Sequence, residues 1–394
     1  MDLETFQWLL TDDGQRLLDR ATHVYVDAEG DPVRAASSVR RIEPDADRAA
    51  AALTQVQLRA RAVAKFGDDA VGMYFTPDAL EQSTRARVAA HRAARLAAAQ
   101  PASVIDLGCG IGGDLIAFAR AGLTTAGVDL DPVRVAIAAA NLAALGLPGA
   151  TQVADATSID LSGFAVAFAD PARRSGRGRT FRVEDWTPPW SFVQSLLTRA
   201  AVVKVAPGVP HELIPAGVEA EWVSDDGEVK EASLWSGPLA TVARRATVIG
   251  AGGLATLTED DDPWQGRERP VRELGRFLYE PDGAVIRAGL VTAVAAGVGG
   301  GLIDEHIAWV TSDDSFHTPF ARGYRVLEEV PFREKPLRAA LRERSIGVLT
   351  IKTRGVDVVP ETLRKRLALR GENTATLVLT RIKDTGTALL VAPF

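Results

Sequence analysis

The spacing of hydrophobic and polar positions changes twice along the 394-residue chain. Over residues 1–98 apolar positions recur with helical spacing, in TFQWLL, in QRLLDRA and in an alanine-rich stretch from Asp45 to Phe66. Thr76 and Pro77 form an N-cap followed by proline at the first helical position, which predicts a further helix over ALEQSTRARVAAHRAARLAA. We therefore expect a helical N-terminal region.

From Ala102 onward, strand patterns alternate with helical ones. The strand candidates are SVIDL, TAGVDL, TQVAD, AVAFAD and AVVKVAP, with helical segments expected between the first four. This alternation is typical of a parallel, doubly wound sheet. EAEWVSDD, VKEASLW and ATVIG follow with short turns, and we expect them to form the antiparallel end of the same sheet.

A segment without periodicity, TEDDDPWQGRERP over residues 258–270, indicates a domain boundary. Beyond it the pattern predicts a smaller α/β unit. GAVIRAGL, IGVLTIKTRG and ATLVLTRI are expected to be strands, and PETLRKRLAL a helix opened by proline. The predicted domains are residues 1–98, helical, residues 99–257, with the parallel sheet, and residues 265–394, a small α/β domain.

Composition narrows the class of protein. Hydrophobic residues make up 46% of the chain and charged residues 24%, which is ordinary for a globular protein. The one cysteine excludes a disulfide framework, and the five histidines lack ligand spacing, so no metal is predicted. An acidic start, MDLETFQWLL, and the lack of a long apolar stretch predict a cytoplasmic protein without a membrane partner. The oligomeric state stays open.

The charge distribution points to a negatively charged partner. The net charge is −6, yet 13 basic residues stand against 6 acidic ones between Ala321 and Arg370. A basic segment on an acidic body indicates a local binding face rather than general polyanion binding.

The stretch VIDLGCGIGG, residues 104–113, fits two kinds of nucleotide-binding loop. Gly108, Gly110 and Gly113 satisfy G-x-G-x-x-G, the dinucleotide fingerprint of oxidoreductases. Gly108, Gly110 and Gly112 equally satisfy G-x-G-x-G, the loop of S-adenosylmethionine enzymes. Both loops need glycines for close approach to the ligand, so the glycines alone do not decide.

Three acids at strand ends favour S-adenosylmethionine. Asp106 lies two residues before Gly108, where it would repel a pyrophosphate but attract an ammonium group. Asp129 ends the second strand, the position from which a carboxylate accepts both ribose hydroxyls. Asp155, followed by Ala156, ends the third strand and is placed to meet the exocyclic amine of adenine.

Residues 102 to about 210 resemble class I S-adenosylmethionine-dependent methyltransferases. VIDLGCGIGG matches the glycine motif, VDLDP the ribose motif, ADA the adenine motif and FADPARR the catalytic motif. The whole chain resembles bacterial methyltransferases with a C-terminal THUMP-like domain, in MYFTPDALEQ, FADPARRSGR, VVKVAPG and IKTRGVDVVPETLRKRL. The resemblance implies a Rossmann-like fold with a seven-stranded sheet, S-adenosylmethionine as cofactor and RNA bases as substrates.

The fourth strand leads to the candidate catalytic residues Asp170, Pro171 and Arg173. Enzymes that methylate amino groups of bases usually have Asn/Asp-Pro-Pro-Tyr/Phe here. In this chain Asp170 can still accept a hydrogen bond from an acceptor N–H, but Arg173 could stack only through its guanidinium plane. Enzymes that methylate C5 of uridine use a cysteine nucleophile. The one cysteine of this chain, Cys109, lies in the glycine loop, so that mechanism is excluded unless another residue takes the place of the cysteine. Lys204, in a central strand, needs a partner for its charge, and a functional role for it is not favoured.

Basic residues predict how RNA would be held. Arg174, Arg177 and Arg179 follow the catalytic motif, and Lys352 and Arg354 lie in the basic C-terminal segment. The leading hypothesis is methylation of a base in structured RNA, either tRNA or rRNA. A small-molecule methyltransferase and a non-catalytic RNA-binding protein that keeps the cofactor pocket remain the alternatives. The loop that contains Arg174, Arg177 and Arg179 could equally be a solvated segment that binds no ligand.

Overall fold

The computed structural model describes the whole chain except residues 30, 174–185, 266–267 and 269. The chain divides into two compact units. The first unit comprises Met1–Val205, Val209–Val218 and Ser233–Ala240, and the second comprises Ala206–Gly208, Glu219–Ala232 and Thr241–Phe394.

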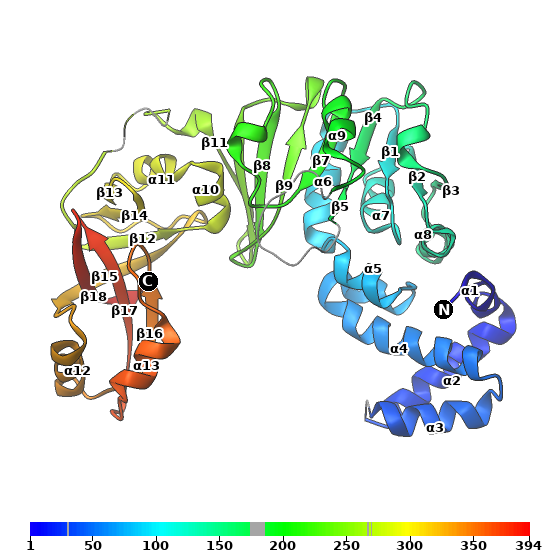
Figure 1. Cartoon of the computed structure of the whole chain (residues 1–394), viewed down its shortest axis with the longest axis horizontal. Helices are drawn as coiled ribbons and strands as arrows, with labels where there is room; N and C mark the ends of the chain where they lie inside the picture. The colour runs from blue at the N-terminus through cyan, green and yellow to red at the C-terminus, as the bar shows by residue number, and fades with distance from the viewer. Residues whose placement is uncertain (30, 174–185, 266–267, 269) are drawn as a thin grey trace. The chain divides into compact units, whose positions relative to one another are not determined.

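The first unit begins with helices, as predicted (blue to cyan in Figure 1). They are α1 (Leu3–Leu9), α2 (Asp12–Asp27), α3 (Pro32–Ile42), α4 (Ala46–Phe66), α5 (Pro77–Gln82) and α6 (Ala86–Ala98). The Asp45 carboxylate caps α4, and the Thr76 hydroxyl accepts the Ala79 N–H at the start of α5, as the Thr76-Pro77 pair predicts.

The prediction of a single helix after Pro77 is wrong, because the helical conformation is interrupted at residues 83–85, between α5 and α6. Ser83 is extended, with ψ of 142°. The Lys65 ammonium, at the end of α4, donates to the carbonyl oxygens of Leu80, Glu81 and Ser83. These carbonyls therefore have a side-chain partner where a continuing helix would have used backbone N–H groups.

Alternating strands and helices follow, again as predicted. They are β1 (Val104–Leu107), α7 (Gly113–Arg120), β2 (Thr125–Asp129), α8 (Pro132–Ala144), β3 (Ala150–Val153), β4 (Val166–Ala169), α9 (Trp190–Leu196) and β7 (Ala201–Val205). The strands pair in parallel in the order β3-β2-β1-β4-β7. The helix expected between β3 and β4 is only a short 3-10 turn, Ala156–Ser158. Two-residue strands β5 (Ala172–Arg173) and β6 (Trp186–Thr187) pair antiparallel.

The sheet has nine strands in the order β11-β10-β8-β9-β7-β4-β1-β2-β3. The strands from β3 to β8 (Glu219–Asp225), including β9 (Glu228–Trp235), supply the seven expected ones. Asp226 and Gly227, both with positive φ, form the tight turn between β8 and β9. The sheet then extends through β10 (Arg244–Gly250) and β11 (Gly253–Thr258). β10 pairs parallel to β8, so the expected antiparallel end is wrong there, because the chain crosses to the far side of β8.

The second unit also contains a seven-stranded sheet in the order β13-β14-β12-β15-β18-β17-β16. Its strands are β12 (Phe277–Pro281), β13 (Gly301–Asp304), β14 (Ile307–Ser312), β15 (Ala321–Val330), β16 (Ile346–Thr353), β17 (Asn373–Ile382) and β18 (Thr385–Pro393). Its helices are α10 (Gly283–Ala288), α11 (Val291–Gly297), α12 (Glu334–Glu343) and α13 (Pro360–Leu367).

In this unit the predictions of β16, α13 and β17 are confirmed, and that of a strand in GAVIRAGL is wrong. That segment forms α10. The Asp282 side chain caps its first turn, and Gly289, with φ of 71°, ends it in the left-handed conformation.

One hydrophobic core joins the N-terminal helices to the helices beside the glycine loop. It contains Phe6, Leu18, Phe66 and Phe75 together with Ile111, Leu115 and Ile137. The N-terminal helices of the first unit therefore pack directly against α7 and α8, which flank the candidate site.

Candidate cofactor and catalytic site

The parallel register aligns the carboxyl ends of β1, β2, β4 and β7. Leu107 pairs with Val128 and with Ala169, and Ala169 pairs with Val203. The residues that follow these four are Gly108, Asp129, Asp170 and Lys204. Ligands of open α/β sheets bind outside the carboxyl ends of the strands, so this row is the candidate site.

The glycine loop after β1 uses backbone conformations that favour glycine. Gly108, Gly110 and Gly112 have φ values of 102°, 55° and 87°. A β-carbon added at Gly108 or Gly110 would meet no atom within 4 Å, so the loop is open on that side. Gly112 caps α7 without a side-chain hydrogen bond. The loop thus offers room for a ligand and leaves N–H groups of the helix start available to it.

Asp129 fixes this loop to the end of β2. One carboxylate oxygen accepts the Gly110 N–H at 3.0 Å, and the other accepts the Asp131 N–H at 2.9 Å. A carboxylate oxygen accepts more than one hydrogen bond, so both oxygens keep capacity for ligand hydroxyls. This arrangement is compatible with the predicted ribose contact.

Asp106, in β1, is a buried carboxylate with 2% of its surface exposed. Within the described ranges its Oδ1 atom has no hydrogen-bond partner. Burial raises the pKa of Asp106, the charges of Asp114, Asp170 and Asp129 raise it further, and the charge of Arg92 lowers it. A buried polar oxygen without a partner is costly. The ammonium group of S-adenosylmethionine would supply the missing donor and a compensating charge, so the site fits this cofactor.

Asp170, directly after β4, is paired with Lys204 of β7. The Lys204 ammonium lies 2.6 Å from Asp170 Oδ2 and also donates to the Thr84 hydroxyl at 3.0 Å. Thr84 donates to Asp114 at 3.0 Å, and Asp114 forms a buried ion pair with Arg92. The partner that the charge of Lys204 requires is therefore the predicted catalytic acid.

The other two predicted catalytic residues lie next to Asp170 in the chain. Pro171 is buried. The backbone of Arg173 pairs with that of Trp186 in the β5–β6 ladder. Their proposed roles stay predictions.

The segment Tyr74–Phe75, before α5, joins the glycine loop through Asn141 of α8. The Asn141 side chain accepts the Tyr74 N–H at 2.7 Å and donates to the carbonyl oxygens of Tyr74 and Ile111, at 3.1 and 2.9 Å. Gln55 of α4 makes a matching pair of hydrogen bonds with Phe75, at 2.7 and 2.9 Å. Sequence reasoning missed this contribution, because Asn141 and Gln55 look like ordinary helix positions.

Two exposed apolar side chains lie at the ends of β2 and β3. Leu130, directly after Asp129, is 64% exposed, and Val153 is 50% exposed. Asp155 is exposed and accepts the backbone and hydroxyl hydrogens of Thr157, which lower its pKa. Exposed apolar residues beside a strand-end acid fit a flat heterocycle, a signal that the sequence reading did not use.

The predicted RNA-binding residues have different fates. Arg174, Arg177 and Arg179 lie outside the described residues. Lys352 forms an ion pair with Glu280 at 2.6 Å. Arg354 donates to the Ala308 carbonyl and lies over the Trp309 ring, and burial lowers its pKa.

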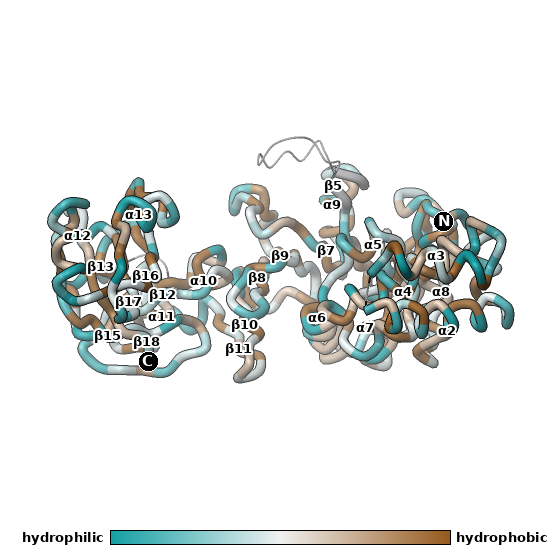
Figure 2. The backbone as a smooth tube through the Cα atoms, turned by 90° about the horizontal axis from the view of Figure 1, so that it is seen from below, coloured by the Kyte–Doolittle hydropathy of each residue, from teal (hydrophilic) through white to brown (hydrophobic). Residues whose placement is uncertain are grey.

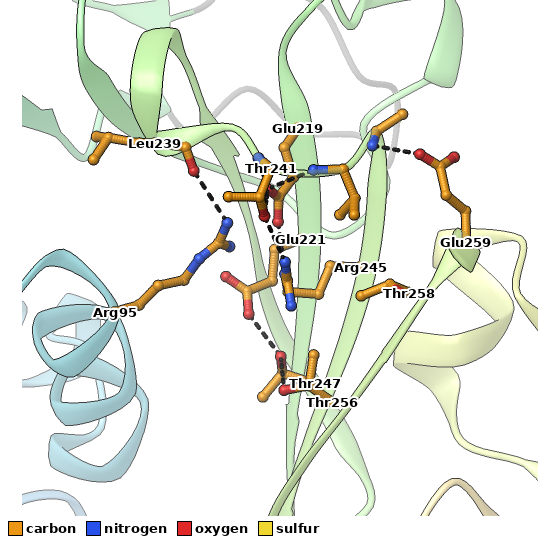
Figure 3. A network of polar contacts seen from close by, with 12 residues as sticks. Arg95, Glu219, Glu221, Leu239, Thr241, Arg245, Thr247, Thr256, Thr258 and Glu259 are labelled. Carbon is orange, nitrogen blue, oxygen red and sulfur yellow. Dashed lines mark hydrogen bonds and ion pairs between the residues drawn. The ribbon is translucent and has the colours of Figure 1, made fainter. Parts of the chain in front are cut away.

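A separate polar network joins β8, β10 and β11 in the second unit (Figure 3). The buried Glu219 carboxylate accepts hydrogen bonds from the N–H and hydroxyl of Thr241 and pairs with Arg245 at 2.6 Å. Glu221 accepts the Thr247 hydroxyl at 2.6 Å. These acids have protein partners, so the network is explained by strand pairing rather than by a ligand.

The described ranges hold neither a metal-ligand cluster nor a membrane-spanning helix. Nowhere there do three or more His, Cys, Asp or Glu side chains gather as metal ligands would. None of the helices there combines the length and the apolar composition that a bilayer crossing requires.

Similar proteins agree with a methyltransferase fold. Residues 82–194 match the model of a methyltransferase domain, residues 321–393 that of a THUMP domain-like family, and residues 2–62 a domain of unknown function. A crystal structure from Porphyromonas gingivalis W83, named for a candidate methyltransferase, has a TM-score of 0.73 at 20% identity. It covers 96% of this chain and 98% of that one, and it supports the fold.

The sequence relatives are closer. An uncharacterized S-adenosylmethionine-dependent methyltransferase, found with equal similarity in two strains of Mycobacterium tuberculosis, is 39% identical over 347 residues. The match covers 85% of this chain and 94% of the relative. The chain therefore belongs to the S-adenosylmethionine-dependent methyltransferases, with a THUMP-like region at its C-terminus.

Proposed function

We propose that this methyltransferase transfers the methyl group of S-adenosylmethionine to a base in structured RNA, either a tRNA or an rRNA. The THUMP-like region, residues 321–393, supports RNA as the substrate class, because the resemblance to methyltransferases with such a domain implies RNA bases as substrates. The surplus of basic residues in the same region supports it independently.

The buried Oδ1 atom of Asp106, which has no hydrogen-bond partner among the residues that the structure describes, is the observation that carries the cofactor assignment. We assign to Asp106 the ammonium group of the cofactor and to Asp129 its ribose hydroxyls. Gly108, Gly110 and Gly112 form the cradle through their backbone. Adenine is assigned to Asp155 and Ala156, with the exposed Leu130 and Val153 as apolar contacts.

Asp170 is the group that meets the acceptor in this proposal. When bound, S-adenosylmethionine supplies a methyl group on a sulfonium, which is open to in-line displacement. Asp170 accepts a hydrogen bond from an acceptor N–H and so orients the base, Pro171 keeps the turn rigid, and Arg173 stacks on the base. A cysteine route is not part of the proposal, since Cys109 is buried and burial raises the pKa of its thiol.

RNA is held mainly by the C-terminal region. In this proposal residues 1–98 and 99–257 form the helical and methyltransferase domains, and residues 265–394 bind RNA. Arg174, Arg177 and Arg179 are proposed to contact the sugar–phosphate backbone of the RNA near the methyl donor. Because Lys352 and Arg354 already have protein partners, we add the exposed Arg333, Lys335 and Arg342 on and beside α12 as phosphate contacts.

Transfer of tritium from labelled cofactor into RNA tests the proposal. The RNA comes from a strain that lacks the gene, so its target base is unmethylated. We expect label in tRNA or rRNA with the unaltered protein and at least about a hundredfold less with Asp170→Ala. Calorimetry with S-adenosylhomocysteine shows whether each variant still binds the cofactor.

The same experiment separates the alternatives. RNA binding that weakens steeply with salt, without label transfer, would mean a binding protein that lacks the chemistry. No RNA binding at any salt concentration would favour a small-molecule acceptor. Nucleoside mass spectrometry of the methylated RNA then identifies the base.

A further inference from the structure

We propose that Lys204 is a positioning residue for methyl transfer, which holds the Asp170 carboxylate in the orientation that meets the acceptor. This inference rests on the proposed function and deepens it. Lys204 does not touch the acceptor in this view. It acts through Asp170.

The two side chains are adjacent by construction of the sheet. Ala169 and Val203 are paired in the parallel register of β4 and β7, so Asp170 and Lys204 are the next residues on both strands. The ammonium lies 2.6 Å from Asp170 Oδ2, and 16% of the lysine side chain is exposed against 34% for the aspartate. Among the described residues Oδ1 of Asp170 accepts no hydrogen bond. One oxygen is thus held by Lys204, and the more solvent-accessible carboxylate keeps its second oxygen for a ligand.

The Thr84 hydroxyl fixes where the ammonium sits. Lys204 can only donate and the Asp114 carboxylate can only accept, so the single hydroxyl proton of Thr84 points to Asp114. Its lone pair then faces Lys204. Asp114 is itself held by the buried Arg92. The order of donors therefore runs in one direction, from Lys204 through Thr84 to Asp114, and the ammonium is bound by Thr84 and Asp170 together.

The charges explain why a lysine is tolerated beside a cationic ligand. Asp106, Asp114, Asp129 and Asp170 lie close enough to interact electrostatically around Asp106. Arg92 pairs with Asp114 and Lys204 with Asp170. The carboxylates of Asp106 and Asp129 remain for the positively charged cofactor. Lys204 can thus orient Asp170 without opposing the sulfonium.

Lys204→Met in the full chain tests the proposal by steady-state methylation of the target RNA. We expect kcat to fall about 10- to 100-fold, because small displacements of an orienting group cost about that much. KM for RNA and the affinity for S-adenosylhomocysteine should change less than about threefold. Lys204→Arg should recover a large part of kcat. Arg40→Met, at an exposed cation of α3 outside the proposed RNA-binding residues, should change nothing.

A double-mutant cycle distinguishes positioning from general stability. If Lys204 acts through Asp170, adding Lys204→Met to Asp170→Asn should cause no further loss of kcat. Multiplying losses, or an unaltered kcat in folded Lys204→Met, would overturn the proposal. Should Lys204→Met fail to fold, Thr84→Val replaces it, with Thr84→Ser as its matched control. The valine variant should then lose kcat and the serine variant should keep it.

A structural measurement separates this inference from the proposed function. Crystal structures with S-adenosylhomocysteine show the orientation of Asp170 directly, and in Lys204→Met its carboxylate should have turned from its unaltered position. An unchanged orientation rejects the positioning role even if RNA is methylated. Absence of methyl transfer by the unaltered protein rejects the proposed function, whatever Asp170 does.

Discussion

At the scale of single residues, Asp106 is expected to favour cofactor binding and to lower the stability of the ligand-free protein. We expect Asp106→Asn to weaken S-adenosylhomocysteine binding at least about tenfold, since the amide oxygen can still accept a hydrogen bond from the ammonium group but no longer carries a negative charge. The same change should stabilise the ligand-free protein at pH 7 by about 0.5–2 kcal/mol, because a buried unpaired charge is removed.

The pH dependence of that gain has a defined sign. Burial raises the pKa of Asp106 in the folded protein above its ordinary value of 3.8. The stability that the protonated group contributes is complete at low pH and is lost as the pH rises through the folded pKa. The advantage of Asp106→Asn should therefore shrink as the solution is acidified, in urea unfolding of both proteins. Asp357→Asn, an exposed acid, is the control, and a gain that grows on acidification would contradict the assignment.

Gly110 tests the open face of the glycine loop. Its φ of 55° strains any other residue, and an added methyl group would enter the space assigned to the cofactor. Gly110→Ala should cost about 1–2 kcal/mol of stability and lose most of the cofactor affinity. Gly146→Ala is a matched control, since Gly146 has φ of 64° and also faces open space. It should lose similar stability and keep cofactor affinity, as measured by urea unfolding and calorimetry. Equal losses of affinity would refute the cradle.

At the scale of elements, two side chains hold the segment before α5 from opposite helices. Asn141 of α8 binds Tyr74 and the glycine-loop residue Ile111, whereas Gln55 of α4 binds Phe75 alone. Replacement of either by leucine leaves buried backbone groups unpaired and should cost about 2–4 kcal/mol. Only Asn141→Leu should also weaken cofactor binding, by about tenfold or more, because it releases the loop. Calorimetry on both variants compares them. Equal weakening would mean that the segment, and not the link to Ile111, supports the site.

The same segment shows where sequence reasoning reaches its limit. The strand-end acids Asp106, Asp129 and Asp170 were predictable, because parallel strands always bring their carboxyl ends to one edge. Thr84 was not, since helical periodicity continues through it. The break there depends on Lys65, whose ammonium comes from another helix to bind the carbonyls of α5. Likewise the residues of α10 have a strand-like composition, and the segment is a helix because Asp282 caps its start and Gly289 ends it.

At the scale of the whole molecule, alternation of strands and helices was enough to predict the fold class but not the full sheet. β10 is parallel to β8 because the chain crosses β8 and adds β10 on the side away from β9. The pattern of hydrophobic and polar residues does not specify on which side the next strand is added. The basic surplus of the C-terminal region was visible in the sequence. Which of its residues are available was not, because ion pairs such as Lys352 with Glu280 form between distant positions.

The basic residues of the C-terminal region that are exposed to solvent lead to a prediction on RNA binding. Half of the residues of α12 are charged, so teal segments stand beside white and brown ones along it in Figure 2, and Arg333, Lys335 and Arg342 are exposed on or beside it. The triple alanine variant of these residues should bind RNA more weakly and lower the slope of log affinity against log salt by about 1 per lost phosphate contact. Arg344→Ala is the control, because its guanidinium is already paired with Glu328 at 2.6 Å. Cofactor binding should stay unchanged in both variants. If the triple variant keeps the full salt slope, phosphate recognition belongs elsewhere, and the arginines at 174, 177 and 179 become the residues to replace next.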